Sequence, residues 1–177
     1  MFYAIHRTIK FALFCGVLWV VWKAYEHRQV AEPALIWYDV WDNGGFNEKP
    51  MPMLNGHVEK VLSSQTFIMS GTNHARFNVR LMGLRDPSKD MNIAAMEHEK
   101  KRHEALKDLI EGKDIRLAMG YENFNNVGGI VFLGMTNVNS YLVREGLAFT
   151  EKELVKGFSK EIQYQMLWSQ RHHVAAN

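Results

Sequence analysis

Hydrophobic and polar residues alternate along the middle of the chain, with breaks at which small polar residues gather. The apolar positions are Val58, Val61 and Leu62, then Phe67 and Met69, then Phe77, Val79 and Leu81. Serine, glycine and asparagine occupy the breaks near residues 63–64 and 70–73, where turns form readily. This alternation predicts three short β-strands joined by two turns.

A longer spacing follows, in which apolar residues recur every three or four positions. Residues 93–110 are expected to form a helix that Gly112 ends. The other expected elements are helices at residues 138–145 and 160–173, strands at 115–119 and 130–133, and a turn or bulge at Gly128-Gly129. This order predicts an α+β fold that is mainly a β-barrel, a five-stranded Greek-key barrel of the OB class with about three helices packed on it.

An uncharged apolar run, residues 11–22, lies near the N-terminus between Lys10 and Lys23 and contains the single cysteine of the chain. With its flanks it reaches about 17 residues, the shortest length that spans a bilayer. The sequence after it lacks the small residues of a signal-peptide cleavage site. We therefore expect a single-pass membrane anchor within residues 1–27, with a cleaved signal peptide or a buried helix as alternatives. A connector at 28–55 and a folded domain at 56–174 would follow.

The formal net charge of +2 is unevenly distributed. Arg7, Lys10 and Lys23 lie in the first 25 positions, which hold no acidic residue, so 18 basic residues face 19 acidic ones in the rest of the chain. A domain that grips a phosphate backbone carries a basic excess, so nucleic acid is not an expected partner. The basic, acid-free N-terminus favours a domain on the non-cytoplasmic or intermembrane-space side of a membrane. It suits the mitochondrial inner membrane, with a bacterial inner membrane as the alternative.

The connector contains an apolar run of its own, residues 34–41, which includes Trp37 and Trp41. The run is consistent with an added strand, followed by a turn at Asn43-Gly44-Gly45. The two tryptophans have two interpretations: they cap the core of the domain, or they form contacts with a partner.

Two motifs in the domain point to a known family. Residues 139–148 read Asn-Ser-Tyr-Leu-Val-Arg-Glu-Gly-Leu-Ala, and residues 80–87 read Arg-Leu-Met-Gly-Leu-Arg-Asp-Pro. The first resembles the Asn-x-x-Leu-Val-Arg-x-Gly-Leu-Ala helix and its exit in the thermonuclease, or staphylococcal-nuclease-like, family. The second is similar to that family's arginine strand and the Asp-Thr-Pro-Glu loop after it. The resemblance spans about residues 57–168 and implies the OB-like barrel of that family.

The resemblance also implies an incomplete catalytic site. Family members bind calcium and activate water with carboxylates, but Gln65 stands at the metal position of the first turn, Arg85 replaces the loop aspartate and Ser88 replaces the general base. Arg80 is the only family catalytic position that is retained, and residues 126–130 hold no second arginine. Calcium needs six to eight oxygen ligands, so no metal, no cofactor and no catalytic residue are expected.

The sequence therefore predicts a catalytically inactive, membrane-anchored domain. It would serve as a structural, accessory or assembly subunit of a membrane protein complex, with a mitochondrial respiratory or ATP synthase complex as the favoured setting. One alternative is a nucleic-acid-binding OB module that stacks bases on aromatic residues such as Phe67 and Phe77. The other is a residual calcium-dependent nuclease that depends on Arg80.

Overall fold

The computed structural model describes residues 16–17, 19–20, 22–23, 28–44, 51–71, 75–85, 93–123 and 126–173. The chain divides into two units, Met1–Tyr38 and Asp39–Asn177, and the division falls within helix α2 (Arg28–Asp42). The second unit contains the barrel and the helices that cover it.

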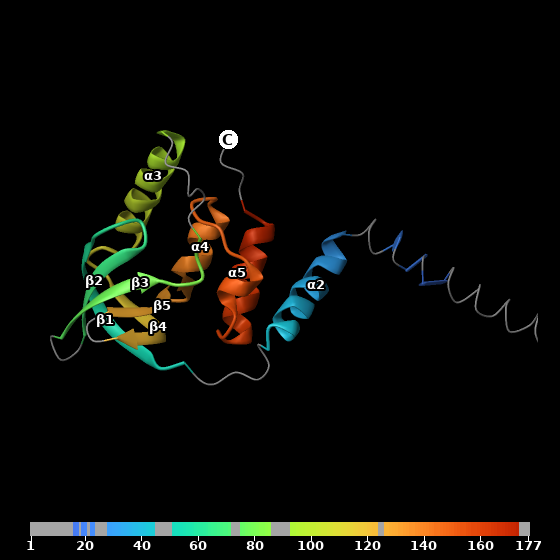
Figure 1. The fold of residues 1–177 in the computed structure, drawn as a ribbon, viewed down its shortest axis with the longest axis horizontal. Helices are drawn as coiled ribbons and strands as arrows, with labels where there is room; N and C mark the ends of the chain where they lie inside the picture. Colours follow the sequence, from blue (N-terminus) through green and yellow to red (C-terminus); the bar gives the residue numbers. More distant parts are fainter. Residues whose placement is uncertain are drawn as a thin grey trace, which may run out of the picture. The chain divides into compact units, whose positions relative to one another are not determined.

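Five strands form a closed mixed barrel (Figure 1), and a short sixth strand pairs with the end of β5. The strands are β1 (Met53–Val61), β2 (Thr66–Gly71), β3 (Arg76–Leu81), β4 (Asp114–Asn123), β5 (Asn126–Leu133) and β6 (Thr136–Asn137). Antiparallel pairs link β3, β2, β1, β4 and β5 in that order, and a parallel pair between β3 and β5 closes the circle. The predicted five-stranded α+β barrel is confirmed.

The barrel core comes from the alternation that the sequence shows. Successive side chains of a strand point to opposite faces, so every second residue enters the interior. The fully buried residues of the first four strands include Val58, Phe67, Met69, Val79 and Leu117. Phe67 is therefore a core residue and is not exposed for base stacking.

Three of the predicted helices form at the expected places. They are α3 (Ile93–Ile110), α4 (Val138–Arg144) and α5 (Lys160–Arg171), with a 3-10 turn η1 (Lys152–Val155) before the last. Side chains cap two of them, because Asn137 accepts a hydrogen bond from Ser140 N and Ser159 accepts one from Ile162 N. Gly146 follows α4 with a φ of 69°, a left-handed conformation that glycine adopts without strain.

The strand expected in the connector is wrong, because residues 34–41 lie within helix α2. Ile36 and Val40 are buried, four residues apart, as on one face of a helix. The apolar residues between them reach the surface instead of filling the second face of a strand. Asn43 and Gly44 form a turn, as predicted, but the turn ends α2: Gly44 has a φ of 73° and its N–H donates to Trp41 O.

Ion pairs hold the end of α2 within the second unit. Lys152 contacts both Asp42 and Asp39, and Arg171 Nη2 donates to Asp39 Oδ2 at 3.0 Å. Asn43 Nδ2 donates to Lys152 O at 2.6 Å. Acidic residues in the last turn of a helix lie at its negative end, which is unfavourable. The two cations offset that repulsion and couple α2 to η1 and α5.

Gly128-Gly129 forms part of strand β5, so of the two alternatives predicted there, a turn or a bulge, the turn is wrong. A Cβ on Gly129 would lie 2.3 Å from Ala118 O in β4, which explains why glycine is required at this close approach. The irregularity lies in the opposite strand, where the β4–β5 register shifts between Met119 and Tyr121. A bulge in β4 therefore accompanies the two glycines of β5.

Across the part of the chain that the structure describes, no helix has both the length and the apolar character needed to cross a bilayer. Most of the predicted anchor, residues 1–27, lies outside the described residues.

Candidate functional site

The turn between β1 and β2 is the first place at which a nuclease of this architecture would need a metal ligand. It is built by hydroxyl groups: Ser63 Oγ accepts hydrogen bonds from Gln65 N at 3.2 Å and Thr66 N at 3.1 Å. Leu62 N also donates to Thr66 O at 2.9 Å. Gln65 is 7% exposed. The turn therefore presents a neutral, mostly buried amide where a carboxylate would be needed.

A buried positive charge lies directly behind this turn. Arg102 of α3 is only 1% exposed, and its Nη2 donates to Ser64 Oγ at 2.7 Å. Ser64 Oγ in turn donates to Glu99 Oε1 at 3.3 Å, and Arg102 has further interactions. A buried guanidinium is costly to desolvate and persists where hydrogen bonds and a counter-charge satisfy it. The guanidinium of Arg102 therefore places a positive charge next to the β1–β2 turn.

Sequence reasoning missed Arg102, since it lies in a charge run that reads as a solvated helix face. The signal that would have found it is spacing. Arg102 precedes Leu106 by four residues and Ile110 by eight, and both of these are fully buried. Residues four apart share a helix face, so the arginine belongs to the face that packs on the barrel.

The structure brings Gln65, in the turn before β2, close in the backbone to Arg80 of β3. Leu81 N donates to Gln65 O at 2.9 Å, and Arg80 pairs with Thr66 across the β2–β3 ladder. Arg80 is exposed on the outer side of β3, and on its other side it pairs with Gly128 of β5. Arg80, the retained family position, therefore faces solvent, and its neighbour on β5 is Gly128.

Arg85 is held in a different set of contacts. Its N–H donates to Phe149 O at 2.7 Å, and its guanidinium pairs with Glu151. An arginine at this position offers no ligand to a cation, and this one is paired with a carboxylate. Ser88 lies outside the described residues.

The residues of the Asn139–Ala148 motif make structural contacts within the fold. Asn139 is fully buried, accepts from Val131 N at 3.0 Å and donates to Met82 O at 2.8 Å. One side chain thus ties α4 to β5 and to the end of β3. Both Leu142 and Ala148 are buried as well.

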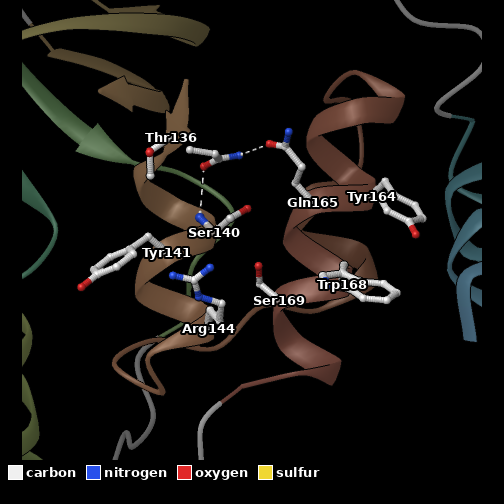
Figure 2. Close-up of a pocket in the computed structure, with 9 residues that line it drawn as sticks. Thr136, Ser140, Tyr141, Arg144, Tyr164, Gln165, Trp168 and Ser169 are labelled. Carbon is white, nitrogen blue, oxygen red and sulfur yellow. Dashed lines mark hydrogen bonds between the residues drawn. The ribbon is translucent and has the colours of Figure 1, made fainter. Parts of the chain in front are cut away.

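A groove of about 380 Å³ runs between α4 and α5, and Figure 2 shows the residues that line it. Asn137 Nδ2 donates to Gln165 Oε1 at 3.0 Å across the groove, and Arg144 lies over the ring of Tyr141 at 5.6 Å. The lining offers hydroxyls, amides and one guanidinium. Of the expected site residues that the structure describes, none lines this groove.

The two connector tryptophans lie on the surface of α2. Trp37 is 39% and Trp41 63% exposed, so neither belongs to the buried core.

Comparison with known proteins agrees with this architecture. The family model described as staphylococcal nuclease homologue matches residues 78–172, which is more than half of the chain. The chain belongs to this family. No curated protein matches it. The matched residues run from β3 through α5, so Arg80 and Arg85 lie within the family match and Gln65 precedes it.

The described residues do not fit the calcium ion that the family's chemistry uses. Across these residues, no group of three or more His, Cys, Asp or Glu side chains is arranged to hold a metal ion. A divalent cation beside Gln65 would meet the charge of Arg102 and would have an amide oxygen in place of a carboxylate.

Proposed function

We propose that this chain is a non-catalytic member of the staphylococcal nuclease homologue family. An anchor within residues 1–27 holds it at a membrane, where it serves as an accessory or assembly subunit of a membrane protein complex.

The buried guanidinium of Arg102 is the observation that carries the non-catalytic part. Its 2.7 Å hydrogen bond to Ser64 places it one residue from the position where a metal ligand would have to stand. If a carboxylate replaced Gln65, a calcium ion bound to it would be repelled by the charge of Arg102.

The remaining catalytic positions support the same conclusion. Arg80 alone could stabilise charge on a phosphate, but cleavage also needs an oriented and activated nucleophile. The loop position that would help to supply it holds Arg85, whose side chain is committed to Glu151.

The N-terminal sequence supports the membrane part. Residues 11–22 carry no charge, and the described residues Val17, Trp19, Val20 and Trp22 are all exposed. An apolar segment with such surfaces is stable in contact with lipid or with another apolar chain. The acid-free, basic N-terminus favours the mitochondrial inner membrane, with a bacterial inner membrane as the alternative.

Solubilisation of native membranes in mild detergent tests the assembly role. We expect the chain to resist extraction by alkaline carbonate and to migrate with other subunits at a mass well above its own 20.5 kDa. Migration as a lone chain would refute the role in a complex.

A nuclease assay tests the catalytic half separately. The purified full chain, with calcium and either single-stranded DNA or RNA, should show no turnover above that of an Arg80→Ala variant. Turnover that this substitution abolishes would mean that the protein is an enzyme.

A further inference from the structure

Helix α2 presents an uncharged aromatic face. With 3.6 residues per turn, Ala34, Trp37, Tyr38 and Trp41 lie on one side of the helix. All four are exposed, and Tyr38 and Trp41 have 58% and 63% of their surface accessible. The opposite side carries the buried residues Ile36 and Val40. The aromatic face is therefore a surface of α2 and not part of a core.

This face follows closely on the apolar N-terminal run. Residues 11–22 end six positions before α2 begins at Arg28, and Trp19 and Trp22 are themselves exposed. Tryptophan and tyrosine favour the boundary between hydrocarbon and water, where the ring is apolar and the N–H or O–H reaches a polar partner.

The acidic residues of α2 do not oppose contact with a bilayer. Asp39 and Asp42 flank the aromatic face, and each pairs with Lys152 or Arg171. These pairs compensate the two negative charges that would otherwise be repelled by anionic headgroups.

We propose that Trp37, Tyr38 and Trp41 insert into the headgroup region of a lipid bilayer, so that α2 lies along the membrane surface. The inference rests on the proposed anchor in residues 1–27 and adds a second contact with the membrane. The anchor would fix the protein in the membrane. Helix α2 would hold the start of the second unit, at Asp39, close to the membrane surface.

Tryptophan fluorescence of the full chain tests this contact in vesicles of phosphatidylcholine and phosphatidylglycerol that contain brominated lipid. A Trp19→Phe, Trp22→Phe, Trp168→Phe variant keeps only Trp37 and Trp41. We expect its emission to shift to the blue and to fall at least about twofold with bromine near the headgroups, and less with bromine deep in the acyl chains.

Two matched variants separate the inference from the anchor. A variant that keeps only Trp168 of α5 should show little quenching, and equal quenching of Trp168 and of Trp37 with Trp41 would overturn the proposal. A variant that keeps only Trp19 and Trp22 reports on the anchor. Quenched Trp19 and Trp22 with unquenched Trp37 and Trp41 would overturn the α2 contact and leave the anchor standing. Unquenched Trp19 and Trp22 would overturn both.

Discussion

Removal of Arg102 should restore metal binding to a site in which the missing acids have been replaced. The background for this experiment is Gln65→Asp, Arg85→Asp, Ser88→Glu, which supplies the three carboxylates that the family resemblance implies. In this background Arg102 remains, and we expect no calcium binding at millimolar concentration. Adding Arg102→Met should then produce it, because methionine fills the space of the buried stem without its charge.

The size of the effect follows from the position of the guanidinium. Arg102 Nη2 lies 2.7 Å from Ser64 Oγ, and the new carboxylate stands on the next residue. One residue adds about 3.8 Å along the chain, so an ion bound there would lie about 7 Å from the guanidinium. An uncompensated unit charge and a divalent ion at about 7 Å repel by about 5 kcal/mol at an effective dielectric near 20, and Glu99, which accepts from the same Ser64 Oγ, reduces this figure. We therefore expect a gain in calcium affinity of up to about a thousandfold.

Isothermal titration calorimetry measures this gain, and thermal melts followed by circular dichroism establish that each variant is folded. The matched control is Lys101→Met in the same background, which removes an exposed positive charge from the neighbouring position of α3. The control should bind calcium no better than the background. If the triple variant binds calcium equally well with and without the Arg102→Met substitution, the electrostatic reasoning is wrong.

Three further substitutions test the fold and the α2 contacts. Asn139→Ala should lower the free energy of unfolding in urea by about 2–5 kcal/mol, since it leaves buried Val131 N and Met82 O without their partner. Gly129→Ala should cost about 2–4 kcal/mol in the same assay, because its Cβ would lie 2.3 Å from a backbone oxygen of β4. Pairing with Lys152 holds the pKa of Asp42 below its usual range, so the unfolded chain protonates first and stability should fall as the pH drops below about 4. Lys152→Met should weaken this dependence in melts between pH 5 and pH 3, and an unchanged dependence would show that the pair does not couple folding to protonation.

The sequence predicts those elements whose pattern and end signals agree. Helices α3 and α4 appear where their apolar spacing places them, and Gly112 and Gly146 end them as expected. The β-strands of the barrel follow the alternation of residues such as Val58 and Phe67. Local signals are sufficient here because each residue's preference matches its place in the fold.

The elements that the sequence misassigns depend on tertiary contacts. Residues 34–41 look like a buried strand because they are continuously apolar, whereas the helix they form buries only one side. Gly128-Gly129 looks like a turn, but the glycines serve the close approach of β4 and β5. Arg102 looks solvated because it lies in a charge run, and its burial follows from the packing of α3 on the barrel. For α2 and Arg102 the outcome depends on which side chains are buried, and for the two glycines it depends on how closely two backbones approach.

The ion pairs at the end of α2 have a mechanical consequence. Asp39 and Asp42 fasten the end of this helix to Lys152 and Arg171, so tension applied at that end passes into η1 and α5 before it reaches β1. The hydrogen bonds between the strands of the barrel therefore carry less of this tension. The fastening is made of exposed charges, which salt screens within about 8 Å under physiological conditions. The junction should therefore yield well before the barrel does, and it should yield more easily as ionic strength rises.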